Sequence, residues 1–562
     1  MRCGMPEAHE GKESTVSGNR ITESPASSPS RIADVVALWA QQSPDHPALV
    51  DASGTWTYGD LASVISETQT WLLGSGIRPG DRVIVVGENC RAFGALLLAL
   101  GGIDAWPVPV NAHLSAREID GIRDHCGARR VLFTTGISPH AADHAKRYGA
   151  IAAGPIELGE IGLGPLREDV EPEPLDANVS ERVAALIYTS GTTGLPKGVM
   201  LTHKNLLFTA AGSAKIRTLT PQDHLYGVLP MSHVIGLSTI LVGTLISGAT
   251  LHLAPRFDPM AARVTLERER ITIMLGVPAM FVQFLRYAKM KKADSLHFPA
   301  LRIISCSGAP LYASVKFAVE KLFGLTLHHA YGVSECSPNV AQTRVERPRS
   351  DTSVGEAFPG VELKVTRTDG EPAAEGEVGE LFVRGPNVMK GYYCAPEETA
   401  AAIDADGWFN TRDLARLEDG NFFIVGRTKD LIIRSGFNVY PAEVEGVLNG
   451  HPSVMQSAVI GRSVDGDEEV LAFVQPIPGA SLTSRELDEY AATRLAPYKR
   501  PSRVLLLSVM PVTPTGKIVK AELAKINIDS AAPMLATAES QSALDLHSQI
   551  LPAVPSQTPP SK

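Results

Sequence analysis

Residues 188–203 read Tyr-Thr-Ser-Gly-Thr-Thr-Gly-Leu-Pro-Lys-Gly-Val-Met-Leu-Thr-His. Hydroxyl side chains, glycines and one lysine, Lys197, are packed between two apolar flanks. Glycine lets backbone N–H groups come close to a ligand, and successive N–H groups with hydroxyls and an ammonium form a cradle for an anion. The apolar run Val183–Tyr188 predicts a buried strand that ends at this cradle, where a ligand can reach it. The stretch therefore predicts a loop that binds a polyphosphate.

Two other interpretations of this loop are disfavoured. A Walker A loop needs Gly-x-x-x-x-Gly-Lys followed by Ser or Thr, whereas here Pro196 precedes Lys197 and Gly198 follows it. This spacing argues against a P-loop kinase or ATPase. A flexible polar linker does not usually combine paired Gly-Thr repeats, a lone lysine and tight apolar flanks.

Composition limits the class of protein. A length of 562 residues predicts about two to four domains, and 44% hydrophobic with 20% charged residues is typical of a globular soluble chain. The net charge of −9 provides no general attraction to nucleic acid or to an anionic membrane, so we expect no nucleic-acid partner. The six cysteines are scattered without a Cys-x-x-Cys pair, which argues against a disulfide framework or a zinc site and fits the cytoplasm.

One uncharged segment is long enough to question the prediction of a globular soluble chain. Val234–Leu251 approaches the length of a membrane span, but serine, threonine and glycine interrupt it repeatedly. We expect a buried helix followed by a strand there, and no membrane span.

Secondary-structure patterning predicts the fold. Short strands such as Val83–Val86 and Ala105–Pro109 alternate with helices such as Ala92–Gly101, a pattern typical of parallel sheets covered by helices. After Val354, short strands joined by Gly- and Asp-rich turns indicate a small β-rich subdomain.

We therefore expect an α/β protein with a large N-terminal domain of helix-covered, mainly parallel sheets, a small β subdomain, and a small mobile α+β C-terminal domain. The predicted units are a disordered extension at 1–30, an N-terminal domain at 31–426 with its β subdomain at about 354–426, a C-terminal domain at 427–527, and a disordered tail at 528–562.

Five motifs in order carry a family resemblance. After the loop come Ser307-Gly-Ala-Pro310, Tyr331-Gly-Val-Ser-Glu335, Asp413, Arg427-Thr-Lys429 and Pro514-Thr-Gly-Lys517. Together they resemble the adenylate-forming superfamily, which includes acyl- and aryl-CoA synthetases, luciferases and peptide-synthetase adenylation domains. Such enzymes activate a carboxylic acid as an acyl-adenylate and then pass the acyl group to a thiol. The resemblance extends over about Ile32–Lys525.

The resemblance implies a site for ATP and Mg²⁺. It assigns the phosphates to Thr189, Ser190, Gly191, Thr192, Thr193, Gly194 and Lys197. It assigns adenine, ribose and the α-phosphate to Ser307, Gly308, Ala309, Pro310, His329, Ala330, Tyr331, Gly332, Ser334, Asp413 and Arg427. It places Mg²⁺ at Thr193 and Glu335, and magnesium needs only a few hard oxygen ligands besides phosphate. Arg412 stands where the family usually has glycine.

Catalysis and CoA binding also follow from the resemblance. Attack of a carboxylate on the α-phosphate builds negative charge, which Lys517 would stabilise in the transition state; we expect its neighbour Lys520 to be solvated. His233 would lie near the carboxylate and the path of the thiol. The C-terminal domain would rotate about Lys429, bringing the segment with Ser435 and Gly436 to the site for CoA.

The acid is the least determined part. The resemblance gives plausible pocket walls at Val234, Leu237, Met280, Ser307, Gly308, Gly332, Val333, Pro338 and Asn339. Mostly apolar and small, these residues suit a hydrophobic monocarboxylic acid, either fatty or aryl. Alternatives are an enzyme that loads a carrier protein, an inactive nucleotide-binding homologue and, more weakly, a luciferase-like oxidase. Homodimers are common in such families, so the resemblance includes a homodimer among the expected assemblies.

Overall fold

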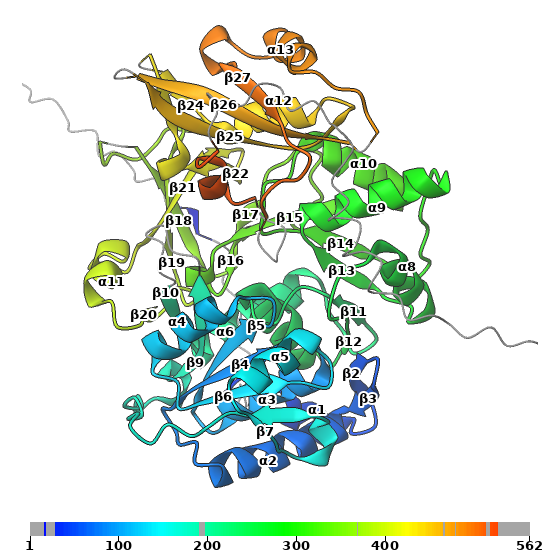
Figure 1. The fold of residues 1–562 in the computed structure, drawn as a ribbon, viewed down its shortest axis with the longest axis vertical. Coiled ribbons are helices and arrows are strands. Elements are labelled where there is room, and N and C mark those ends of the chain that lie inside the picture. Colours follow the sequence, from blue (N-terminus) through cyan, green and yellow to red (C-terminus); the bar gives the residue numbers. More distant parts are fainter. Residues whose placement is uncertain are drawn as a thin grey trace, which may run out of the picture.

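The computed structural model describes residues 16–17, 29–189, 197–367, 369–435, 437–464, 467–477, 479–512 and 518–526. Its elements form a large N-terminal domain and a smaller C-terminal domain, which lies at the upper end of the molecule in Figure 1. Sheets alternate with helices throughout, which confirms the predicted α/β fold class. The predicted tail at 528–562 lies outside the described residues.

The first sheet of the N-terminal domain has five strands in the order β5-β4-β6-β8-β7. Its strands are β4 (Arg82–Gly87), β5 (Trp106–Asn111), β6 (Arg130–Thr134), β7 (Ile151–Ala152) and β8 (Ile161–Leu163). β4 is fully buried and pairs in parallel with β5 and β6. The helices of this region are α1 (Asp34–Gln42), α2 (Tyr58–Gly74), α3 (Arg91–Gly102), α4 (Ala116–Cys126) and α5 (Pro139–Arg147), with short turns η1 (Ile156–Leu158) and η2 (Val179–Glu181).

The second sheet has nine strands in the order β17-β16-β15-β14-β13-β11-β12-β2-β3. Pairing is parallel from β15 to β2 and antiparallel at the two edges. The strands are β2 (Pro47–Asp51), β3 (Gly54–Thr57), β11 (His224–Gly227), β12 (Thr250–Leu253), β13 (Ile273–Gly276), β14 (Ile303–Cys306), β15 (Leu327–Gly332), β16 (Asn339–Gln342) and β17 (Glu356–Ala357). Its helices are α6 (His203–Ile216), η3 (Ile235–Val242), α7 (Gly243–Ile246), α8 (Pro259–Arg268), α9 (Pro278–Lys291) and α10 (Ala313–Phe323).

The uncharged segment Val234–Leu251 is a helix followed by a strand. It contains η3, which is π-helical, then α7 and the start of β12, and most of its side chains are buried. This confirms the predicted helix–strand pair. Among the residues that the structure describes, no helix has both the length and the hydropathy to cross a membrane.

A third, antiparallel sheet carries the predicted phosphate loop. β9 (Val183–Thr189) pairs with β10 (Lys197–Thr202), which pairs in turn with β20 (Gly391–Tyr392). The predicted strand before the loop is confirmed by β9. Helix α11 (Pro396–Ala402) follows β20 directly.

The β subdomain is a five-stranded sheet in the order β1-β18-β19-β21-β22. Its strands are β1 (Val16–Ser17), β18 (Glu362–Thr366), β19 (Gly379–Arg384), β21 (Phe409–Glu418) and β22 (Asn421–Arg427). The sequence predicts disorder for residues 1–30, and this prediction is wrong at β1. The edge strand β18 offers unpaired backbone groups, which Val16 and Ser17 satisfy by pairing with Leu363 and Glu362.

The C-terminal domain follows β22 and begins with η5 (Thr428–Asp430). It contains β23 (Ile432–Arg434), β24 (Phe437–Val439), α12 (Pro441–Asn449), β25 (Val454–Val464), β26 (Asp467–Pro476), α13 (Ser484–Ala492), η6 (Pro497–Lys499), β27 (Arg503–Leu506) and α14 (Lys520–Leu523). Its own core packs α12 and α13 against the sheet β25-β26-β27.

A buried carboxylate ties three segments of the N-terminal domain together. Asp104, 7% exposed, follows α3 and accepts hydrogen bonds from Arg31 (2.9 and 3.0 Å) and Arg182 (2.7 Å). Arg31 precedes α1 and Arg182 precedes β9, while His203 at the start of α6 accepts from the Ile32 amide. Burial alone would raise the pKa of Asp104, but the charged partners hold it well below its usual range.

We predict that Asp104→Asn lowers the free energy of unfolding at pH 7 by roughly 2–4 kcal/mol, because two arginines lose their buried partner. Since the folded-state pKa is depressed, the carboxylate stabilises the fold above its ordinary pKa and loses this effect as the pH falls. The gap between variant and wild type should therefore shrink below about pH 4. Urea unfolding at several pH values measures this, with the exposed Asp169→Asn as control. A constant gap would contradict it.

Candidate active site

The structure describes most of the predicted site residues. Ser190, Gly191, Thr192, Thr193, Gly194, Gly436 and Lys517 lie outside the described residues, so their predicted roles stay predictions. The predicted nucleotide and magnesium residues among the rest lie mainly on β9 and β10, after β14, at the end of β15 and in η4 (Ser334–Cys336), and on β21 and β22. The predicted acid-pocket, hinge and CoA residues lie on other elements: His233 and Val234 precede η3, Leu237 lies in η3, Met280 on α9, Asn339 on β16, Lys429 in η5 and Ser435 between β23 and β24.

Lys197 and Glu335 are brought together by a residue that the sequence did not predict. The Tyr392 hydroxyl donates a 2.9 Å hydrogen bond to Glu335 Oε1, and the Tyr392 ring lies 5.0 Å from Lys197 Nζ. Lys197 also forms an ion pair with Glu398 of α11. Pairing of β20 with β10 positions Tyr392, because Val199 is its partner in the register.

Neither Tyr392 nor Glu398 stands out in the sequence. Both lie about 200 residues after Lys197, and the pairing of β10 with β20 brings them to it. The resulting cluster has an ammonium, an aromatic ring and two carboxylates, which suits a site for a metal-bound polyphosphate.

A second cluster joins three predicted residues. The Tyr331 hydroxyl, at the end of β15, donates to Asp413, which is 3% exposed. Arg427 Nε donates to the other Asp413 oxygen at 2.8 Å. Burial and the nearby carboxylate raise the pKa of Tyr331 well above its usual value. The hydroxyl therefore stays protonated and remains a donor to Asp413.

Arg412 shows why glycine is usual beside this aspartate. Its φ is +58°, in the left-handed region that favours glycine. The turn keeps its geometry through two local hydrogen bonds, from the Arg412 amide to Asn410 Oδ1 (2.8 Å) and from the Asp413 amide to Thr411 Oγ1 (3.1 Å). Arginine at this position thus leaves Asp413 in place.

The loop Ser307–Pro310 follows β14 and borders an apolar region. Gly308 has φ +82°, and an ideal Cβ there would lie 3.5 Å from Val277 Cγ1 and 3.9 Å from Ile235 Cδ1. Val277 and Ile235 were not predicted from the sequence. They pack in the same hydrophobic cluster as the predicted pocket residues Val234, Leu237, Met280 and Val333.

Gly332 is required by a close backbone approach. An ideal Cβ at this position would lie 2.0 Å from the Pro338 carbonyl oxygen, so any side chain would push β15 away from the loop. The neighbouring Asn339 is buried, and its side chain donates to Thr239 Oγ1 at 3.3 Å. Both features bring Pro338 and Asn339 against β15 and η3.

The loop that carries His233 is held by Asn89, another residue that the sequence did not predict. The Asn89 amide donates to the carbonyls of Gly227 (3.0 Å) and Leu229 (2.9 Å), and its oxygen accepts from the Met231 amide (2.8 Å). The Ile235 amide donates to His233 Nδ1 at 3.3 Å. Asn89 therefore fixes this loop from the end of β4.

His329 is buried and neutral. Burial lowers its pKa to about 4, and its Nδ1 lies 3.1 Å from the carbonyl oxygen of Thr352. A neutral ring presents no charge to a ligand at neutral pH. Its predicted place at the adenine edge stays a prediction.

The predicted hinge residue Lys429 and the predicted CoA residue Ser435 lie at the start of the C-terminal domain. Lys429 lies in η5 and is exposed. The amide and hydroxyl of Ser435 donate to the Asp467 carboxylate at 2.6 and 3.0 Å, which anchors the β23–β24 turn to β26. Beside it, Phe437 stacks on Tyr498 with ring centroids 4.7 Å apart.

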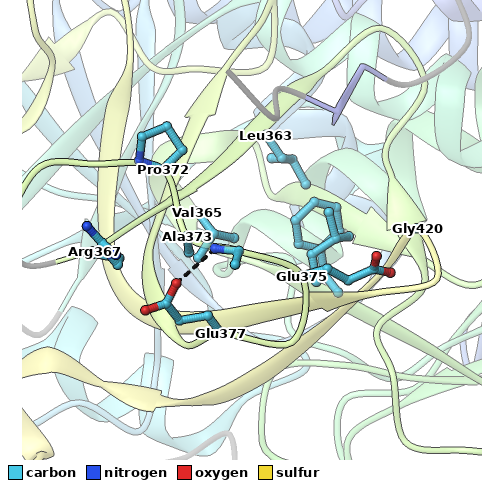
Figure 2. A pocket seen from close by; sticks show the side chains of 11 residues that line it. Leu363, Val365, Arg367, Pro372, Ala373, Glu375, Glu377 and Gly420 are labelled. Atoms are coloured by element: carbon cyan, nitrogen blue, oxygen red, sulfur yellow. Dashed lines mark hydrogen bonds between the residues drawn. The ribbon is translucent and has the colours of Figure 1, made fainter. Parts of the chain in front are cut away.

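A cavity of about 560 Å³ lies elsewhere, in the β subdomain. Figure 2 shows its lining, in which Leu363 and Val365 of β18 face a loop carrying Ala373, Glu375 and Glu377. Glu377 accepts a hydrogen bond from the Ala374 amide at 2.9 Å, so it is engaged with its own loop. No predicted site residue is among the residues that line this cavity.

Comparison with known proteins places the chain in a family. The model of the AMP-binding enzyme family matches residues 36–393, and that of the AMP-binding enzyme C-terminal domain matches residues 443–517. Feruloyl-CoA synthase from Amycolatopsis sp is 36% identical over 492 residues, covering 86% of this chain and 96% of that protein. The long-chain-fatty-acid–CoA ligase of Bacillus subtilis (strain 168) is 37% identical over 349 residues, covering 61% of each chain.

A solved structure agrees with these matches. The o-succinylbenzoate–CoA synthetase of Bacillus subtilis, in complex with ATP and a magnesium ion, has a TM-score of 0.75 and 27% identity, covering 87% of this chain and 99% of that one. The chain therefore belongs to the AMP-binding, adenylate-forming enzyme family and is an AMP-forming acid–CoA ligase that uses ATP, Mg²⁺ and CoA.

Proposed function

We propose that this ligase activates a hydrophobic aryl monocarboxylic acid. The observation that carries the proposal is the apolar region beside Gly308, bounded by Ile235, Val277 and Met280. A flat ring fits beside a residue without a side chain, and none of the predicted pocket residues, all of which the structure describes, is an arginine that could pair with a second carboxylate. Feruloyl-CoA synthase, which is named for an aryl acid, matches over 86% of this chain, whereas the long-chain-fatty-acid relative matches over 61%.

In the proposed site, Lys197 binds the β- and γ-phosphates of ATP and Glu335 holds Mg²⁺ with Thr193. Tyr331 stacks on adenine, and Asp413 accepts the ribose hydroxyls. Tyr331 and Arg427 support this arrangement because each uses one lone pair of a different Asp413 oxygen, and the carboxylate keeps further lone pairs for the ribose.

Lys517 and His233 complete the proposed chemistry. The ammonium of Lys517 stabilises charge that builds on the α-phosphate as the carboxylate attacks. His233 lies near the carboxylate on the loop fixed by Asn89. The C-terminal domain, 427–527, then rotates about Lys429, and the segment with Ser435 and Gly436 contacts CoA.

The same residues would also suit two other functions. The enzyme could instead load a carrier protein, or it could bind nucleotide without turnover. Lys197, Glu335, Asp413 and Lys517 are all present, and a decayed site would not keep all four. We further propose that the protein acts in the cytoplasm, without nucleic acid, as a monomer or a homodimer.

The substrate class is tested by product analysis. With Mg²⁺ and ATP, we expect acyl-CoA, AMP and pyrophosphate from aryl acids such as ferulic acid, and at least roughly tenfold lower kcat/KM with palmitic acid. Mass spectrometry with and without CoA identifies the products. Preference for palmitic acid would contradict the aryl proposal. Acyl-AMP accumulating in the presence of CoA would favour carrier loading, and ATP binding without any product would favour an inactive homologue.

The lysine is tested by separating the half-reactions. Lys517→Ala should slow adenylation by roughly 10²–10³-fold, the usual effect of losing one donor to developing charge. Thioester formation from synthetic acyl-AMP and CoA should remain, because the domain rotation removes Lys517 from the site. Pyrophosphate release and thioester formation measure the two steps. Equal loss in both would contradict the domain rotation.

The role of Tyr392 is tested by removing its two contacts in turn. Tyr392→Phe keeps the ring under Lys197 but loses the hydrogen bond to Glu335, and should lower kcat/KM for ATP roughly tenfold. Tyr392→Leu also loses the ring and should lower it further. Tyr393→Phe is the matched control, because its hydroxyl donates to Glu173 at 2.7 Å, away from Lys197. Equal values for Tyr392→Phe and Tyr393→Phe would contradict the role.

A further inference from the structure

One hydrogen bond between tyrosine and glutamate joins the two domains. Tyr312 lies directly after the loop Ser307–Pro310 and immediately before α10. Its hydroxyl donates a 2.9 Å hydrogen bond to Glu445 Oε2, on α12 of the C-terminal domain. A residue next to the proposed adenine loop therefore contacts the domain that is proposed to rotate.

Glu445 is buried and makes contacts on both its oxygens. It is 5% exposed, and its Oε1 accepts from the Val459 amide and from Lys520 Nζ, each at 2.8 Å. The sequence predicts a solvated Lys520, and this prediction is wrong. A buried carboxylate is costly without a cation, so Lys520 folds back against α12. Lys520 follows Lys517 by three positions in the chain.

The surfaces around this contact fit closely. An ideal Cβ at Gly446 would lie 3.5 Å from the Tyr312 ring, so the helix passes directly beside the aromatic side chain. Ser314 Oγ reaches the Asn449 carbonyl oxygen at 3.4 Å. Burial and the adjacent Glu445 raise the pKa of Tyr312 well above its usual value, so its hydroxyl remains a donor at physiological pH.

We propose that Tyr312, Glu445 and Lys520 form an interdomain latch that favours the adenylation half-reaction. This inference rests on the proposed roles of Ser307–Pro310 and Lys517. The latch connects the large-domain residue beside the adenine loop to the small-domain segment that follows Lys517. These are positioning residues, and rotation of the C-terminal domain for thioester formation breaks the Tyr312–Glu445 hydrogen bond but leaves the Glu445–Lys520 ion pair intact.

The contacts of Glu445 are of two kinds, those within its own domain and one between the domains. Its bonds to Val459 and Lys520 lie within the C-terminal domain, whereas the bond to Tyr312 exists only when the domains are docked. Removing the Tyr312 hydroxyl therefore destabilises the docked arrangement and leaves the fold of the C-terminal domain intact. The rotated arrangement, which lacks this bond, is unaffected.

The test compares Tyr312→Phe with wild type in both half-reactions. Acid-dependent ATP–pyrophosphate exchange should fall roughly ten- to a hundredfold, the effect of one hydrogen bond to a charged group. Thioester formation from synthetic acyl-AMP and CoA should remain within about twofold of wild type or rise. Tyr148→Phe is the matched control, because its hydroxyl donates to Asp120 at 2.7 Å within the N-terminal domain.

A double-mutant cycle with Glu445→Gln identifies the contact itself. If the latch acts through this pair, Tyr312→Phe should have a smaller effect on exchange in the Glu445→Gln background than in wild type. Additive effects, unchanged exchange in Tyr312→Phe, or equal loss in both half-reactions would overturn the latch. A wild-type enzyme without exchange for any acid would instead overturn the proposed function, and the latch with it.

Discussion

The buried carboxylate of Asp413 holds together the parts that make the site. It accepts from Tyr331 at the end of the nine-stranded sheet and from Arg427 at the end of the β subdomain. At 3% exposure it would be costly to leave unpaired, so these contacts bring β15, β21 and β22 to a common point. The chain passes from Arg427 directly into the C-terminal domain. The first residues of the C-terminal domain are therefore attached directly to this cluster.

The sequence was sufficient where a motif directly follows or ends a buried strand. β9 ends at Thr189 as its apolar run predicted, the small loop Ser307–Pro310 follows β14, and the run Tyr331–Glu335 begins in β15. Gly332 and Gly308 illustrate the reason. Gly332 lies close to the backbone of Pro338, and Gly308 has a φ of +82°. Only glycine meets either requirement without strain, so these positions can be recognised in the sequence.

The sequence was insufficient where a role arises from pairing between distant segments. Tyr392 lies at the site only because β20 pairs with β10, and Asn89 reaches the His233 loop only because β4 ends beside β11. Neither Tyr392 nor Asn89 differs in character from its neighbours in the sequence. The prediction of a solvated Lys520 is wrong for the same reason. Its partner Glu445 lies on a helix 75 positions earlier, and no neighbouring residue in the sequence indicates this ion pair. Strand β1 likewise depends on the distant edge of β18.

Three contacts in this protein share one chemistry, in which a tyrosine of one unit donates to a carboxylate of another. Tyr331 donates to Asp413, Tyr392 to Glu335 and Tyr312 to Glu445. A neutral donor leaves the carboxylate charged and able to accept a metal, a ribose or a lysine in addition. Such a hydrogen bond is worth roughly 1.5–3 kcal/mol, whereas separating a buried ion pair costs roughly 3–5 kcal/mol. Tyrosine is therefore suited to a junction that, in the proposed mechanism, opens in every catalytic cycle, because an arginine in the place of Tyr312 would resist that opening.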